Sequence, residues 1–164
     1  MVNNLTTSKY IYPPLNDLTP ELKNVILHFT LLWSLFEHKL CAENANVSSI
    51  EHKCEQIKAK LDSSKEKFDE FLYYFRARYI TESITNSSFD SLEFRTNDKK
   101  DLVEQVLKLE ETNILNIVIA LLIIVFRYRN NLFHGLKWQN NIEGQEDNFD
   151  NANRLLIKIL EINK

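Results

Sequence analysis

Ten consecutive apolar residues, 117–126, form the longest apolar stretch of the chain. A membrane-spanning helix needs about 20 such residues, so this stretch predicts a buried helix of a folded domain instead. A helix that is apolar on every face must be covered on every face. A small bundle covers one helix completely only with difficulty, and we therefore expect a second copy of the chain to supply part of the cover.

The composition favours helices as well. The 164 residues include only 2 glycines and 3 prolines, too few for the many tight turns of a β architecture. The length fits one well-buried domain. We predict an all-α fold, an up-and-down helical bundle of four to five helices that forms a single domain over residues 1–164. Residues 1–18 are expected to be an extended tail, because Pro13 and Pro14 disfavour helix before them.

The charge distribution limits the possible partners. The net charge of -3 argues against a protein that coats nucleic acid through a general basic field. Within residues 112–142, however, the only charged side chains are those of Arg127, Arg129 and Lys137. A phosphate-binding function would therefore have to be local to this segment.

The first residues, M-V-N-N-L-T-T-S-K-Y, have neither a basic region nor an apolar region typical of a secretory signal. We predict a cytoplasmic protein without membrane association, in which the two cysteines, Cys41 and Cys54, stay reduced. Of the two His/Cys pairs, His38 and Cys41 have helical spacing, but His52 and Cys54 diverge on a helix, and the ends of two helices would have to meet to form a zinc site. We therefore expect no metal and no cofactor.

Thr19, Pro20 and Glu21 are typical of a helix start: an N-cap, a proline at the first position and an acid near the positive end of the dipole. They predict a helix over residues 20–43. A second series of apolar residues follows at near-heptad spacing: Ile50, Cys54, Ile57, Leu61, Phe68, Leu72, Phe75 and Tyr79. This series predicts one long helix over 49–83.

A break at 62–64 is the alternative to the long helix. Ser48 with Glu51, and Ser63 with Glu66, have the spacing of capping boxes at the start of the helix and at this alternative break. Residues 85–91 are predicted to be a loop, because their side chains compete for backbone hydrogen bonds. The next helical region opens at 96–98 and breaks near 112–113, and a short closing helix spans 151–162.

The apolar run leads directly into F-R-Y-R-N-N-L-F-H-G, residues 126–135. On an ideal helix, Arg127, Asn130, Asn131 and His134 share one face. Arg129 falls on the apolar side, among Leu122, Phe126 and Phe133, where a guanidinium would be buried and would need a partner unless the helix bends. The residues alone allow a purely structural interpretation, in which the cations and the histidine stabilise a helix end by roughly 0.3–1 kcal/mol each.

The six residues from Arg129 to His134 also resemble the motif of the HEPN superfamily (higher eukaryotes and prokaryotes nucleotide-binding domain): an arginine, a polar residue, three variable residues and a histidine. The resemblance extends to R-N-N-L-F-H-G at the end of an apolar late helix in a small helical chain. It implies a helical domain that usually dimerises so that two motifs line one groove, and in many cases a metal-independent endoribonuclease. It implies Arg129 and His134 as the catalytic pair, with Asn130 orienting or supporting them.

Further residues are candidates for substrate contact or support. Arg127 faces His134 more directly than Arg129 does on a straight helix, so the projection favours Arg127 where the family favours Arg129. Asn131, Lys137, Trp138 and Glu37 are the other candidates, the last as a carboxylate that could hold an arginine of the motif.

Three functions therefore remain open. The chain is predicted to be an endoribonuclease that cleaves RNA in a toxin-antitoxin or phage-defence setting, with an antitoxin or other partner protein. The first alternative is a non-catalytic HEPN module that binds a nucleotide, RNA or protein. The second is a plain helical scaffold.

Overall fold

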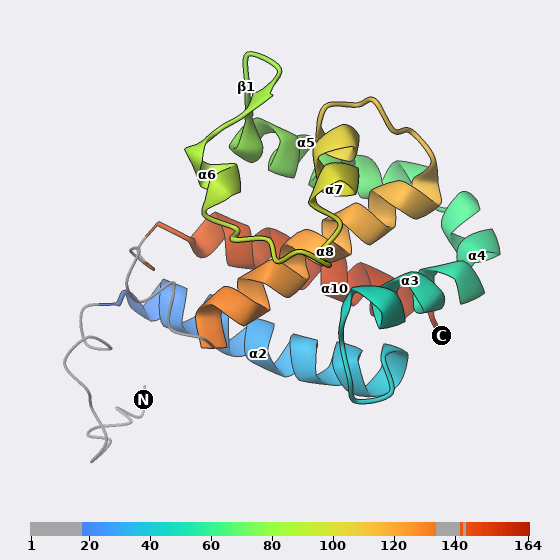
Figure 1. Ribbon diagram of the computed structural model, residues 1–164. Coiled ribbons are helices and arrows are strands. Elements are labelled where there is room, and N and C mark those ends of the chain that lie inside the picture. The colour runs from blue at the N-terminus through green and yellow to red at the C-terminus, as the bar shows by residue number, and fades with distance from the viewer. Residues whose placement is uncertain (1–17, 134–141, 143) are drawn as a thin grey trace.

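A computed structural model describes residues 18–133, 142 and 144–164, so most of the expected tail lies outside the described residues. The chain is arranged as a set of helices around one central helix, with a small hairpin at one end (Figure 1). In chain order, the elements are α2 (Pro20–Leu40), α3 (Val47–Gln56), α4 (Lys58–Asp62), a 3-10 helix (Lys65–Phe68), α5 (Asp69–Tyr79), β1 (Ile80–Thr81), β2 (Ile84–Thr85), α6 (Ser87–Asp90), α7 (Lys100–Leu107), α8 (Ile114–Phe133) and α10 (Glu146–Ile162).

The predicted all-α class is confirmed at this level, since the described residues are mostly helical. They form eight α-helices and one two-stranded hairpin. The expected number of four to five helices is exceeded, in part because α4 and α6 are helices of only 5 and 4 residues. The up-and-down arrangement of the helices and the HEPN-like bundle remain proposals.

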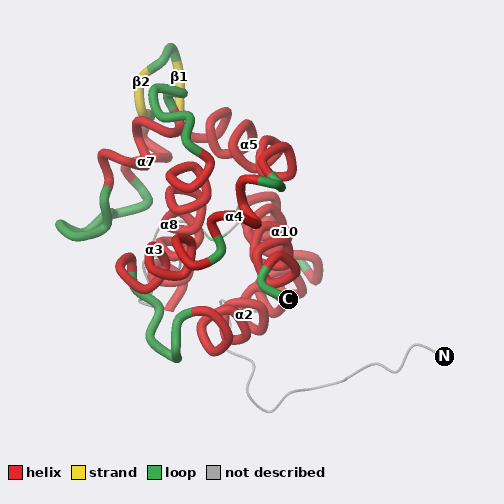
Figure 2. Tube along the Cα trace, turned by 90° about the vertical axis from the view of Figure 1, so that its right-hand side faces the viewer, coloured by secondary structure: helices red, strands yellow, loops and turns green. Residues whose placement is uncertain are grey.

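The apolar run forms α8, which crosses the centre of the molecule in both views (Figures 1 and 2). Residues 117–125 are all buried within the chain. The cover comes from α3, α4, α5, α7 and α10, which all contact α8. The prediction of a buried core helix is therefore confirmed, although α8 is long and apolar enough to cross a membrane. The short helices already bury residues 117–125 within one chain, so this burial does not require a second copy, and the expected second copy stays a prediction.

The start of α2 agrees with the sequence. The hydroxyl of Thr19 accepts a hydrogen bond from the backbone N–H of Leu22 at 3.1 Å, and Pro20 occupies the first turn. The helix ends at Leu40, three residues before the predicted boundary, where Ala42 and Glu43 take positive φ angles. This turn allows the chain to reverse into α3.

The predicted long helix over 49–83 is wrong. The chain divides there into α3, α4, the 3-10 helix and α5, with interruptions at Ile57 and at the predicted alternative break, Ser63–Ser64. All eight apolar residues of the heptad series are nevertheless buried. Apolar spacing therefore identified the residues that face the core, while the breaks allow separate short helices to wrap around α8.

Neither predicted capping box forms. At the start of α3 the N-cap is Asn46, whose side chain accepts from the Ser49 N–H at 3.0 Å, while the Ser49 hydroxyl accepts from the Asn46 N–H at 2.9 Å. At the break, the Ser63 hydroxyl instead donates to the carbonyl of Lys60. The capping box of α3 therefore begins at Asn46, two residues before the predicted start at Ser48.

This difference can be tested by two matched alanine variants. We expect Asn46→Ala to lower the free energy of unfolding by about 0.5–2 kcal/mol, because an N-terminal donor of α3 loses its acceptor. Ser48→Ala, in an exposed residue with no capping bond, should change it by less than about 0.5 kcal/mol. Urea titration followed by circular dichroism measures both, and an equal loss in the two variants would contradict the assignment.

Most of the remaining boundaries also differ from the predictions. Residues 85–91 were predicted to be a loop, but they contain the short helix α6, which is capped by Asn86. The hairpin before this helix pairs Ile80 with Thr85, and Glu82 and Ser83 in its turn have positive φ angles. Helix α7 begins at Lys100 instead of 96–98. The break near 112–113 is confirmed, and α10 begins at Glu146, five residues earlier than predicted.

Candidate functional site

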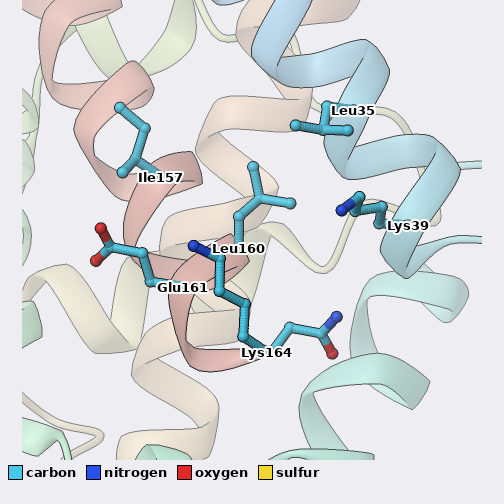
Figure 3. Close-up of a pocket in the computed structure, with 7 residues that line it drawn as sticks. Leu35, Lys39, Ile157, Leu160, Glu161 and Lys164 are labelled. Carbon is cyan, nitrogen blue, oxygen red and sulfur yellow. The ribbon is translucent and has the colours of Figure 1, made fainter.

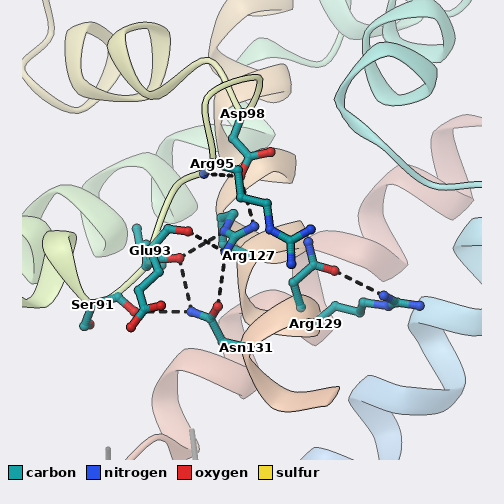
Figure 4. Close-up of polar contacts among 9 residues, drawn as sticks. Ser91, Glu93, Arg95, Asp98, Arg127, Arg129 and Asn131 are labelled. Atoms are coloured by element: carbon teal, nitrogen blue, oxygen red, sulfur yellow. Dashed lines mark hydrogen bonds and ion pairs between the residues drawn. The ribbon is translucent and has the colours of Figure 1, made fainter. Parts of the chain in front are cut away.

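The last two turns of α8 present their polar side chains to two different surroundings (Figure 4). Arg127 and Asn131 face the segment 91–98, which connects α6 to α7. Arg129 points away from that segment, toward α2. Arg127 and Arg129, which the sequence places in one candidate site, therefore have different surroundings in the structure.

Arg127 is almost completely buried, with 2% of its surface exposed. Its guanidinium donates to four acceptors: the Leu92 carbonyl at 3.0 Å, the Glu93 carbonyl at 2.5 Å, the Asp98 carboxylate at 2.9 Å and the Asn131 side-chain oxygen at 3.3 Å. We call Arg127, Asn131 and Asp98 the Arg127 cluster. A guanidinium occupied in this way has little capacity left for a phosphate group.

The Arg127 cluster fixes the conformation of the segment 91–98. The Asn131 amide donates to the carbonyls of Ser91 and Leu92, and Asp98 accepts a further bond from the backbone N–H of Arg95 at 2.8 Å. Glu93 has a φ of 53°, which costs an L-residue roughly 1–2 kcal/mol. The cluster thus holds a strained, irregular segment that the local sequence alone does not favour.

Burial determines the electrostatics of this cluster. Removal from water lowers the pKa of Arg127, and the negative charge of Asp98 opposes that effect by favouring the charged form. The positive charge of Arg95 lowers the pKa of Arg127 further. Because a guanidinium keeps its proton in proteins, the cluster contains a buried ion pair.

Arg129 is only partly buried. Its Nη1 donates to the Asn130 side-chain oxygen at 3.1 Å, and its guanidinium lies over the ring of Phe133 at 5.3 Å from the centroid. Its Nε is buried without an acceptor among the described residues. Arg129 therefore lacks the complete set of partners that Arg127 has, and it precedes His134 by five positions in the sequence.

This arrangement reverses the expectation from the helical projection. The face that carries Arg127 and Asn131 is covered by the segment 91–98, whereas Arg129, on the predicted apolar side, is only partly buried at the end of α8. The predicted proximity to Phe133 is confirmed. Asn130 is buried, and its side-chain oxygen accepts a hydrogen bond from Arg129.

Arg95 is a cation near this site that the sequence reasoning missed. It is exposed, its charge acts on Arg127, and Figure 4 shows its side chain directed toward the arginines of α8. It lies far from the motif in sequence, in a segment whose path depends on the Arg127 cluster. Nothing in the local pattern around Arg95 could have indicated this position.

The other predicted residues lie elsewhere or are not described. One side-chain oxygen of Glu37 accepts from the backbone N–H of Ala45 at 3.0 Å, so it ties α2 to the start of α3, and no bond to a motif arginine is found. His134, Lys137 and Trp138 lie outside the described residues. Among the residues that the structure describes, no group of three or more His, Cys, Asp or Glu side chains could hold a metal ion.

Comparison with protein-family models, with curated proteins and with solved structures finds no match to this chain.

Proposed function

We propose that the protein is a metal-independent endoribonuclease of the HEPN type, with Arg129, Asn130 and His134 at its active site. The observation that carries this proposal is the state of Arg129: a partly exposed guanidinium, positioned by Asn130 and Phe133, that makes no ion pair with a described residue. Arg129 can therefore contact a substrate in this proposal, whereas the neighbouring Arg127 already donates to four acceptors within the chain.

These residue types suit cleavage of RNA by its own ribose. The 2′-oxygen attacks the adjacent phosphorus while the bond to the 5′-oxygen breaks, leaving a cyclic phosphate and a 5′-hydroxyl. A histidine can move the proton near neutral pH, and a guanidinium stabilises the charge that grows on the phosphoryl oxygens. Arg95 is the second cation that could contact the RNA backbone.

The resemblance to HEPN proteins also carries the proposals of a homodimer, of a toxin or phage-defence role and of a neutralising partner protein.

The second candidate is a plain helical scaffold, and the Arg127 cluster favours it. Arg127 and Asn131 hold the segment 91–98 and need no ligand to account for their presence. The same structural interpretation could extend to Arg129 if its only role were to stack on Phe133 near the helix end.

One assay separates these functions. We expect the purified protein to cleave labelled RNA equally well with and without a chelator, because no step requires a metal ion, and we expect the cleavage to be lost in His134→Ala. Binding of RNA without cleavage would indicate a non-catalytic module instead. Neither binding nor cleavage would support the scaffold. Comparing the growth of cells that express the intact chain or His134→Ala tests the proposed toxic role.

A further inference from the structure

A cavity of about 510 Å³ lies between the start of α3 and residues 95–99, which lead into α7. Its lining includes Ser48 and Glu51 of α3, Arg95, Asn97 and Lys99 of the second wall, and Phe126 of α8. The Arg127 cluster fixes the course of the segment 91–98 and thereby holds the second wall in place. Cavities of this size accommodate a small organic group with a few polar contacts.

The aromatic side chain of the lining is Phe126, which is only partly buried. The ring of Trp33 lies 6.0 Å from this ring and supports it from α2, while the accessible part of the Phe126 ring lines the cavity. Aromatic rings placed in this way stack on nucleic-acid bases. Phe126 precedes Arg129 by three positions and Asn130 by four, so the three residues lie on neighbouring turns of one helix. The cavity therefore lies about one helical turn before the candidate motif.

Two polar side chains of the cavity have capacity for a ligand. Arg95 is exposed and makes no ion pair with another described residue, and its side chain is directed toward the arginines of α8 (Figure 4). Asn97 is also exposed, and its carboxamide makes no hydrogen bond within the described part of the chain. Lys99 and Glu51, by contrast, form an ion pair that joins the two walls. Arg95 therefore supplies the uncompensated positive charge of the lining.

We propose that this cavity is a subsite for RNA, which takes one unpaired purine next to the cleaved bond and prefers adenine. We call it the purine pocket, formed by Phe126, Asn97 and Arg95. The base stacks on Phe126. The Asn97 carboxamide accepts from the exocyclic amine of adenine and donates to its N7, a pairing that fits the two edges. The Arg95 guanidinium binds the phosphate of the same nucleotide. The inference rests on the proposed function, because it takes RNA as the ligand.

The charge of the purine pocket favours a nucleotide within an RNA strand over a free nucleotide. A phosphodiester carries a single negative charge, which one uncompensated guanidinium matches. A nucleoside triphosphate carries several negative charges and needs several cations around it. The cavity instead contains the carboxylates of Glu51 and Asp98, each of which already has its own cationic partner. These carboxylates disfavour additional phosphate groups.

A groove between α2 and α10 lacks the features of the purine pocket (Figure 3). It has a volume of about 360 Å³ and an apolar floor formed by Leu35, Ile157 and Leu160. Among the described residues that line this groove, none is aromatic and none belongs to α8. The groove offers no ring for a base to stack on and does not adjoin the candidate motif. The purine is therefore assigned to the cavity beside Phe126.

The first test measures RNA binding by fluorescence anisotropy with the His134→Ala protein, so that the RNA stays intact. The probes are a labelled oligouridine and the same oligomer with one central adenosine or guanosine. We expect the adenosine oligomer to bind about tenfold more tightly than oligouridine, and more tightly than the guanosine oligomer. Equal binding of the three oligomers, or no binding of any, overturns the purine pocket. Displacement of the adenosine oligomer by micromolar 5′-AMP would indicate a site for free nucleotides and overturns the assignment to RNA.

Single substitutions in the same protein separate reading of the base from contact with the phosphate. Asn97→Ala should remove the preference for adenosine and leave the salt dependence of binding unchanged. Arg95→Ala should weaken all three oligomers alike, keep the preference, and reduce the slope of log affinity against log salt by about 0.7. Lys60→Ala removes an exposed lysine of α4 outside the cavity and is the matched control. A preference that survives Asn97→Ala, or equal effects of Lys60→Ala and Arg95→Ala, overturns the assignment of these residues.

Cleavage assays distinguish this inference from the proposed function. In an otherwise wild-type protein, Asn97→Ala should cut a mixed-sequence RNA at additional positions, because the base next to the cleaved bond is no longer selected. Cleavage at unchanged positions in Asn97→Ala overturns the purine pocket and leaves the nuclease proposal in place. Binding that depends on Asn97 and selects adenosine, in a protein that cleaves no RNA, removes the nuclease proposal and retains the pocket as a binding site.

Discussion

Arg127→Ala is expected to lower the free energy of unfolding by about 3–5 kcal/mol. The variant leaves the buried carboxylate of Asp98 without its ion-pair partner and the Glu93 carbonyl without its donor, while the Leu92 carbonyl keeps only the Asn131 amide. It also releases a segment whose positive φ at Glu93 the cluster maintains. Domains of this kind are stable by about 5–15 kcal/mol, so the variant should retain only part of its stability.

The controls separate the cluster from general effects of losing an arginine. Arg129→Ala removes a partly exposed guanidinium and should cost less than about 1 kcal/mol. Arg127→Lys should remain strongly destabilised, because an ammonium cannot reach four acceptors in a planar arrangement. Replacing both members of the ion pair, as in Arg127→Met/Asp98→Leu, should recover part of the loss. Urea unfolding followed by circular dichroism measures all four, and a loss below about 1 kcal/mol in Arg127→Ala would contradict the structural role.

The fold was predictable to the extent that it depends on which residues face the core. The run 117–126 indicated the central helix, and the heptad series indicated eight core residues that are all buried. Continuity of the helices was not predictable in the same way. A series of apolar residues at regular spacing is compatible with one long helix and with several short ones, because each short helix buries the same residues. The choice depends on the space around α8, which is a property of the whole fold.

The site illustrates the same limit. A helical projection assigns a polar side chain to a face, but it does not show what covers that face. Arg127 lies on the polar face and is buried, because the segment 91–98 crosses there. Arg129 lies near Phe133, as predicted, and is only partly buried because it is in the last turns of α8. The motif resemblance favoured Arg129 on other grounds, and that choice remains a prediction.

Arg129→Ala is expected to reduce the rate of RNA cleavage by about 10²–10³-fold, because it removes the donor that would stabilise charge on the phosphoryl oxygens. Its fold should be nearly unchanged, and binding of RNA should weaken much less than cleavage, since other cations still contact the backbone. Single-turnover cleavage of a labelled RNA, measured with saturating enzyme, isolates this effect from binding.

Arg127 provides the contrast that makes this result interpretable. If Arg127 acts only through the fold, then Arg127→Ala should lose activity in proportion to the fraction unfolded, and conditions that stabilise the folded state should restore cleavage. Arg129→Ala should not recover under those conditions, because its defect would lie in the reaction itself. Full cleavage by folded Arg129→Ala would exclude this arginine from catalysis and remove the assignment to HEPN-type chemistry. Loss of cleavage in a fully folded Arg127→Ala protein would instead transfer the chemical role to the buried arginine.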